Sequence, residues 1–92
     1  MKVVQTGTFT KVAKKLHQNQ KDTLDVAVKD ILKNPKIGDM KVGDLAGARI
    51  YKFKLNTEQY LLGYRIDDDS LVLTLFALGT HENFYRDMKK IK

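Results

Sequence analysis

The sequence has no cysteine, only one proline and only two histidines in 92 residues. Without cysteine, the chain can form neither a disulfide framework nor a thiolate metal site. His17 and His81 alone are too few to supply a usual zinc site. The N-terminal stretch MKVVQTGTF contains no long apolar run, so we expect no signal peptide and no membrane span. These absences predict a cytoplasmic protein without a metal or cofactor.

Several catalytic signatures are missing as well. We find no glycine-rich phosphate loop, no nucleophile elbow and no pair of catalytic carboxylates. The one acidic cluster is Asp67, Asp68 and Asp69, followed by Ser70. Three consecutive residues in an ordered turn cannot all face one ion, so we interpret this cluster as turn chemistry.

Positive charge is what the sequence has in excess. Seventeen basic and eleven acidic residues give a net charge of +6 and a pI of about 9.6. Residues 1–36 hold eight lysines and three aspartates, and residues 81–92 add a net +2. This balance favours a polyanionic partner, either nucleic acid or an acidic protein, although surface lysines also serve solubility.

Apolar periodicity predicts three helices and four strands. Thr8 or Thr10 can cap a first helix, which the run HQNQ at 17–20 ends. A second helix fits residues 21–33, and Asn34 followed by Pro35 stops it. A final helix follows Thr80, and the expected strands are 1–5, 48–55, 59–66 and 71–79.

This order of elements, β-α-α-β-β-β-α, indicates one α+β domain over residues 1–92. We expect an N-terminal helical hairpin packed on a mostly antiparallel four-stranded sheet. The strand at 71–79 is apolar on both faces, so we expect it at the centre of the sheet.

Strand alternation predicts a basic face. In RIYKFKL at 49–55, Lys52 and Lys54 point away from the side that carries the apolar rings. In the next strand Arg65 and Gly63 share one face, which we assign to the same side. We therefore expect one face of the sheet to hold three cations and a glycine, and the glycine to leave a hollow where a ligand backbone approaches closely. Lysines on an open sheet face are also commonly just solvated.

A second candidate cluster lies in GTHENFY at 79–85. His81 follows the last strand, and histidine is the side chain best suited to proton transfer near neutral pH. If the final helix begins there, its first turn brings Tyr85 near His81. The alternative is that His81 caps the helix and Tyr85 packs in the core. On the same helix, Phe84, Met88 and Ile91 are either core residues or the seat of a partner's helix.

The chain resembles the RelE/ParE superfamily of toxins from bacterial toxin–antitoxin pairs. The resemblance covers nearly the whole chain and rests on LAGARIYKFKL at 45–55 and LLGYRIDDDSLVLTLFALGTHENFY at 61–85. It implies a RelE-like microbial ribonuclease fold. It also implies a metal-independent endoribonuclease that cleaves mRNA, in many relatives in the ribosomal A site, and a cognate antitoxin that neutralises it.

Residue roles follow from the resemblance by position. Lys52 and Lys54 match the basic strand residues of RelE and would bind the scissile phosphate, with one of them a possible base. His81 would be the general acid, or the base if the lysines only bind, and Tyr85 would stack on or orient the nucleotide. The remaining expected RNA- or phosphate-binding residues are Arg65, Arg49, Lys11, Lys14 and Lys15, and the expected antitoxin-binding residues are Phe84, Met88 and Ile91.

The match to the superfamily has departures. Leu61 stands where RelE has an arginine, and the histidines that YafQ-type toxins carry on the preceding strands are absent. Three alternatives therefore stay open. These are a ParE-like toxin that poisons gyrase without cutting RNA, a non-catalytic RNA-binding module, and a degraded toxin that retains only antitoxin binding.

Overall fold

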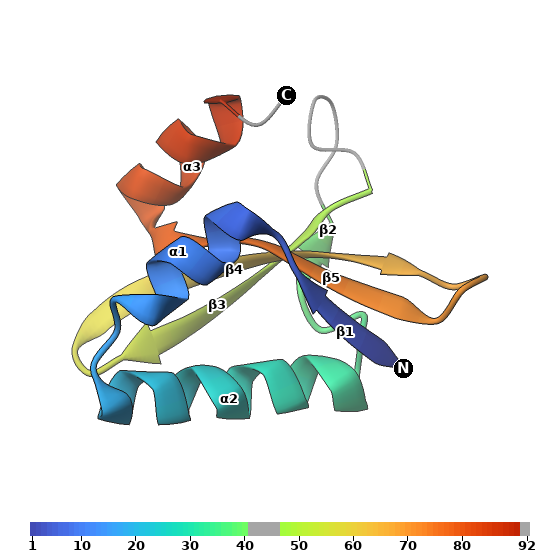
Figure 1. The fold of residues 1–92 in the computed structure, drawn as a ribbon, viewed down its shortest axis with the longest axis horizontal. Coiled ribbons are helices and arrows are strands. Elements are labelled where there is room, and N and C mark those ends of the chain that lie inside the picture. Colours follow the sequence, from blue (N-terminus) through green and yellow to red (C-terminus); the bar gives the residue numbers. More distant parts are fainter. Residues whose placement is uncertain (41–46, 91–92) are drawn as a thin grey trace.

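The structure is a computed structural model that describes the backbone of residues 1–40 and 47–90, and the side chains of residues 1–40 and 47–86. Eight elements follow one another along the chain (Figure 1). They are β1 (Lys2–Gln5), α1 (Gly7–Lys14), α2 (Gln18–Lys33), β2 (Asp39–Met40), β3 (Arg49–Leu55), β4 (Glu58–Asp67), β5 (Val72–Thr80) and α3 (His81–Lys90). The predicted α+β class is confirmed, and the predicted order of elements holds except for the additional strand β2.

The five strands form one sheet in the order β1-β5-β4-β3-β2. β1 runs parallel to β5, and the other neighbours are antiparallel. The expected four-stranded sheet is wrong by one strand, because β2 has only two residues and so gives no alternation to read. The expectation that 71–79 is central is also wrong, since β4 holds the middle of the sheet and β5 lies beside it.

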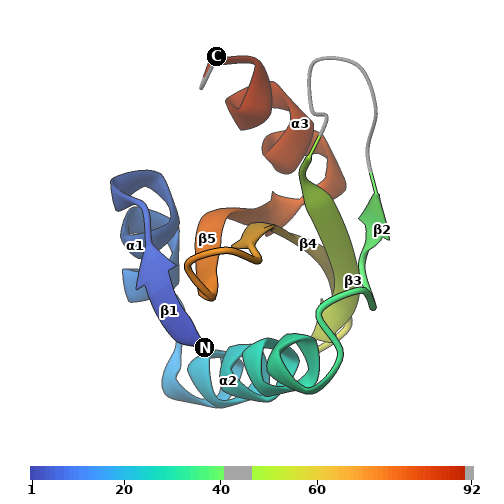
Figure 2. The ribbon, with the colours of Figure 1, turned by 90° about the vertical axis from the view of Figure 1, so that its right-hand side faces the viewer.

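Two separate apolar clusters cover the two faces of the sheet. On one face, here called the α1/α2 face, Phe9 of α1 and Leu24 and Ile31 of α2 pack against strand residues such as Leu62 and Leu75. The opposite face, here called the α3 face, holds a smaller cluster: Ala48, Ile50, Leu61, Phe76, Ala77 and Phe84. Figure 2 shows α2 and α3 on opposite sides of the strands. The expected placement of the two N-terminal helices on one face is confirmed.

The two N-terminal helices begin earlier than the sequence predicts. The Thr6 hydroxyl accepts a hydrogen bond from the Phe9 amide at 3.3 Å and so caps α1, instead of Thr8 or Thr10. The run 17–20 does not end a helix but starts α2, because the Gln20 side chain accepts a hydrogen bond from the His17 amide.

A bulge in β5 adds one residue to the side of this strand that faces α3. The pairing of β4 with β5 shifts between Gly63 and Tyr64, which leaves Phe76 as the extra residue. The Phe76 carbonyl accepts a hydrogen bond from the Thr6 hydroxyl at 3.2 Å. The bulge puts both Phe76 and Ala77 into the cluster of the α3 face.

The loop that follows α2 is held by one buried tyrosine. The Tyr64 hydroxyl donates to the Pro35 carbonyl at 2.7 Å and accepts from the Gly38 amide at 2.9 Å. Burial raises the pKa of Tyr64, so its neutral phenol is the form that fits this site. Among the described residues, no helix is long and apolar enough to span a membrane.

Candidate active site

Lys52 and Lys54 lie on β3 and are exposed on the α3 face. Their neighbours Tyr51 and Phe53 pack against the cluster of the opposite face, and Ile50 lies in the cluster of the α3 face. The predicted alternation of this strand is therefore confirmed. α3 packs on β5 and β4, so the part of this face over β3 remains open around the two lysines.

Strand register brings His81 to the same end of the sheet. Lys54 pairs with Gln59 of β4, and the next β4 residue, Tyr60, pairs with Thr80 of β5. His81 directly follows Thr80 and is the first residue of α3, so it lies next to the end of this strand pair. Phe53 and Thr80 both pair with Tyr60 and are therefore two strand spacings, about 10 Å, apart, and Lys54 and His81 follow them in the chain.

The first turn of α3 adds an aromatic ring to this region. The rings of His81 and Tyr85 lie 5.0 Å apart between centroids and are tilted by 58°. Tyr85 also meets Phe84 edge to face at 5.3 Å. The expected approach of Tyr85 to His81 is confirmed. We call the region around Lys52, Lys54, His81 and Tyr85 the basic corner.

The floor of the basic corner is apolar. Leu61 pairs with Lys52 on one side and Gly79 on the other, and it is 1% exposed within the cluster of the α3 face. The position where RelE-like sequences carry an arginine therefore holds a buried side chain under α3. Within the basic corner, the cations come from β3 and the imidazole from the start of α3.

Arg65 does not join the basic corner. It lies on the α3 face, with its guanidinium carbon 5.1 Å from the centre of the Phe76 ring. However, it is four residues beyond Leu61 on β4, which is about 13 Å along the strand. The expectation that Lys52, Lys54 and Arg65 share one face is confirmed, but shared parity does not imply a shared position along the strands.

The expected hollow at Gly63 is filled by the protein itself. A Cβ atom added at Gly63 would lie 2.9 Å from the Phe84 ring and 3.0 Å from the Phe76 ring. The glycine therefore provides room for these two aromatic side chains, which hold α3 against the sheet, and not for a ligand.

Arg49 belongs to the opposite face of the sheet. It pairs with Tyr64, whose side chain lies in the cluster of the α1/α2 face. The Arg49 guanidinium donates to the carbonyls of Gly38 at 2.8 Å and of Lys36 at 3.3 Å. Its contacts therefore hold the loop after α2, and it lies away from the basic corner.

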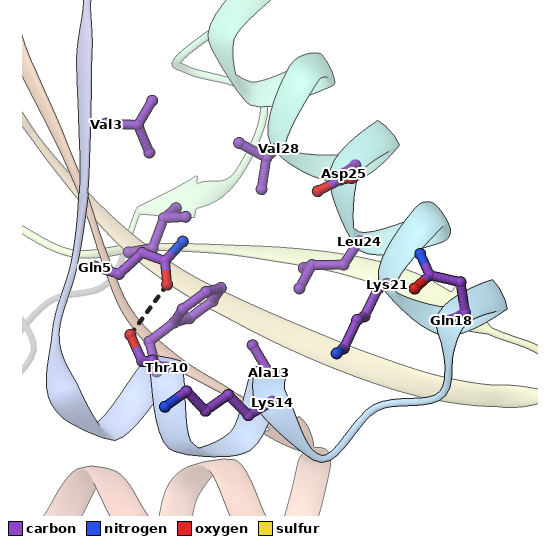
Figure 3. A pocket seen from close by; sticks show the side chains of 12 residues that line it. Val3, Gln5, Thr10, Ala13, Lys14, Gln18, Lys21, Leu24, Asp25 and Val28 are labelled. Atoms are coloured by element: carbon purple, nitrogen blue, oxygen red, sulfur yellow. Dashed lines mark hydrogen bonds between the residues drawn. The ribbon is translucent and has the colours of Figure 1, made fainter.

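The three lysines of the first helical region also lie away from the basic corner. Lys11, Lys14 and Lys15 are exposed beside α1, whose buried residue Phe9 packs on the α1/α2 face. A groove of about 370 Å³ lies between α1 and α2. Figure 3 shows Lys14 on one wall of this groove and Lys21 on the other. A phosphate bound by these lysines would be on the other side of the sheet from Lys52.

Of the residues expected to bind an antitoxin, only Phe84 has a described side chain. It is 1% exposed and is part of the core cluster of the α3 face. The core interpretation of Phe84 is thus confirmed. The side chains of Met88 and Ile91 lie outside the described residues.

The acidic run is a hydrogen-bonded turn. The Asp67 carboxylate accepts from the backbone amides of Asp69 at 3.0 Å and Ser70 at 3.3 Å. Hydrogen bonds from the Ser70 side chain and from these amides lower the pKa of Asp67. Within residues 1–40 and 47–86, no three His, Cys, Asp or Glu side chains gather to hold a metal.

The sequence reasoning missed Gln59. This residue is exposed, pairs with Lys54 and shares the parity of Leu61, so its side chain is on the α3 face between Lys54 and His81. The signal was available in the alternation of 59–66. Gln59 was not predicted as a site residue because an uncharged side chain at the end of a strand matches no charge pattern and no catalytic motif.

Solved structures with a similar fold include bacterial toxins. The toxin of the intact E. coli RelBE toxin–antitoxin complex is 23% identical, with a TM-score of 0.69 over 86% of this chain and 94% of that one. A free mutant form of E. coli RelE is 20% identical, with a TM-score of 0.72 over 89% and 84%. A YoeB/ParE toxin from Agrobacterium tumefaciens is 17% identical, with a TM-score of 0.69 over 88% and 99%.

The chain places two helices on one face of its sheet and a third on the other, and it shares its overall fold with these structures. The family model for ParE-like toxins of type II bacterial toxin–antitoxin systems matches residues 3–89. The chain belongs to this family and is a type II toxin. No curated protein sequence matches it.

Proposed function

We propose that this toxin is an endoribonuclease that cleaves mRNA in the cytoplasm without a metal ion. The observation that supports the proposal most directly is the basic corner, where two exposed lysines and a histidine share one end of one sheet face. In the proposed reaction the 2′-hydroxyl attacks the adjacent phosphorus. A new O–P bond forms, the bond to the 5′-oxygen breaks, and a 2′,3′-cyclic phosphate remains.

The two lysines are placed to stabilise the negative charge that develops on the phosphate during this attack. Lys52 and Lys54 are successive residues of one face, so their backbones are about 7 Å apart along β3. One phosphate can lie between two ammonium groups at this spacing. Ammonium groups that are already in place stabilise the extra negative charge of the pentacoordinate phosphate. If His81 acts as the acid, the reaction needs one of these lysines as a neutral amine, which takes the proton of the 2′-hydroxyl, while the other lysine stays an ammonium group beside the phosphate.

His81 is placed to protonate the leaving group, and Tyr85 is placed to contact the nucleobase. An imidazolium at the start of α3 can donate its proton to the departing 5′-oxygen. Tyr85 packs beside it and offers a ring on which a nucleobase stacks, or a hydroxyl that orients the phosphate. In this assignment every proton and phosphate contact comes from the chain itself.

We propose two macromolecular partners. The first is mRNA bound to the ribosome, whose anionic surface suits a chain of net charge +6. The second is a cognate antitoxin, as in the toxin–antitoxin complexes that share this fold. An acidic segment of the antitoxin would neutralise the basic corner and stabilise so small a domain by binding its folded form.

The test is to induce the toxin in cells and to map the 5′ ends of mRNA. We expect new cuts in translated messages with wild type, and at least a hundredfold fewer with His81→Ala or with the double variant Lys52→Ala/Lys54→Ala. The matched control is Lys29→Ala/Lys33→Ala, which removes two exposed lysines from α2 on the other face. Equal loss in the control would mean that net charge, and not the basic corner, determines cutting.

A ParE-like action on gyrase is the second candidate. The family description and the buried Leu61 in place of a basic residue favour it. It predicts growth arrest with DNA damage and no new mRNA ends. Retained arrest in the Lys52→Ala/Lys54→Ala variant, together with intact messages, would support this candidate over the nuclease.

A further inference from the structure

We propose that Gln59 is a specificity-determining residue that reads the edge of a nucleobase beside the scissile phosphate. The proposal rests on the nuclease function proposed above and names the group of the same site that selects the sequence. It is carried by the position of Gln59 in the sheet and by the chemistry of its neighbours.

Gln59 lies between the two parts of the basic corner, which are the lysines of β3 and the side chains at the start of α3. Its β3 partner is Lys54, and the next β4 residue, Tyr60, pairs with Thr80, which directly precedes His81. It lies on the α3 face, since Leu61 two residues later is in the cluster of that face. A substrate that touches both Lys54 and His81 must therefore pass over Gln59.

The side chain is available for a ligand. Gln59 is exposed, and its amide makes no hydrogen bond with the part of the chain that the structure describes. The other β4 residue in the basic corner, Leu61, is buried and apolar. Gln59 is thus the one polar side chain that the described part of β4 contributes to this corner.

The side-chain amide of Gln59 is better suited to bind a nucleobase than a phosphate. The two lysines of β3 already supply cations for the phosphate, and a neutral amide adds little to that attraction. A glutamine carries a donor and an acceptor side by side, which match the paired donor and acceptor groups on the edges of nucleobases. Unstacked bases of single-stranded RNA expose these edges.

The experiment compares the nucleotide preference around the cuts, position by position, for wild type and Gln59→Ala. We expect the variant to keep cutting and to lose a preference of about fivefold or more at one nucleotide next to the cut. The matched control is Glu58→Ala. Glu58 is also exposed and is adjacent in sequence, but it pairs with Leu55 and lies on the opposite face.

Three other outcomes would each overturn the proposal. An unchanged preference in Gln59→Ala, with cutting retained, would show that Gln59 reads no base while the nuclease proposal stands. A uniform loss at all sites, as expected for Lys54→Ala, would assign Gln59 to phosphate binding instead. The absence of any cut with wild type would remove the nuclease function, and the role of Gln59 with it.

Discussion

The two faces of the sheet differ in how completely they are covered. On the α1/α2 face, two helices bury the strands, and Leu62, Tyr64 and Leu73 have no exposed surface. On the α3 face, one helix covers β4 and β5, and the lysines of β3 remain exposed. The strands alternate in the same way on both faces. The difference arises because, within residues 1–40 and 47–90, a single helix, α3, lies on the second face.

Because of this difference, we expect the stability of the fold and the activity of the toxin to depend on different faces of the sheet. The larger apolar cluster, and hence most of the buried area that drives folding, lies on the α1/α2 face. The open strip over β3 can hold the exposed Lys52 and Lys54 because water solvates their charges. Substitutions on the first face should therefore change the free energy of unfolding, and substitutions in the basic corner should change activity without changing stability.

Ile31→Ala is expected to have the largest effect on stability. Ile31 is fully buried in the cluster of the α1/α2 face, and truncation of such a side chain leaves a cavity that costs about 2–5 kcal/mol. Urea unfolding of the purified toxin measures the loss. The control is Val26→Ala, which truncates a side chain of the same helix that is 57% exposed. Equal losses for the two variants would contradict the assignment of the core to this face.

Gly63→Ala tests the coupling between the sheet and α3. The added methyl group would overlap the Phe84 and Phe76 rings, and overpacking of this kind costs about 1–3 kcal/mol. Displacement of Phe84 would also move its neighbour Tyr85 and the start of α3. We therefore expect RNA cutting, measured on the folded protein, to fall at least tenfold.

The control for this variant is Gly7→Ala. A Cβ atom at Gly7 meets no atom within 4 Å, and alanine favours the helical conformation more than glycine does. We expect wild-type cutting and equal or slightly higher stability. If Gly63→Ala also cuts like wild type, α3 does not depend on the two rings for its position.

Tyr64→Phe is expected to have a smaller effect that depends on pH. Removal of the hydroxyl leaves the Gly38 amide and the Pro35 carbonyl without their partner, at a cost of about 1–3 kcal/mol near neutral pH. The pKa of Tyr64 is raised in the folded state, so its contribution is complete below the ordinary tyrosine pKa and is lost as the pH rises through the folded value.

Unfolding measured from pH 8 to 11 checks both parts of this prediction. The difference in stability between wild type and Tyr64→Phe should shrink above about pH 10. Tyr51→Phe is the control, because the Tyr51 hydroxyl makes a single 3.3 Å hydrogen bond to Asp30 and should contribute about 1 kcal/mol or less. A constant difference across this range would mean that the buried phenol does not resist ionisation.

Much of the fold and part of the site could be predicted from the sequence. The apolar spacing of α2 and the alternation of β3 are local properties, because each element's backbone geometry determines which side chains share a face. That local rule was sufficient to place Lys52 and Lys54 on an open face and Tyr85 beside His81. The two-residue β2 was missed, since it is too short to show any period.

Only the tertiary structure decided where along a face each residue lies. Register between β3, β4 and β5 placed Gln59 beside Lys54 and Arg65 about 13 Å away from Leu61. Packing of Phe84 and Phe76 filled the space at Gly63. Register and helix packing depend on residues far apart in the chain, whereas alternation depends only on neighbours. The sequence by itself therefore determined which residues share a face, and the pairing of distant strands determined which of them meet.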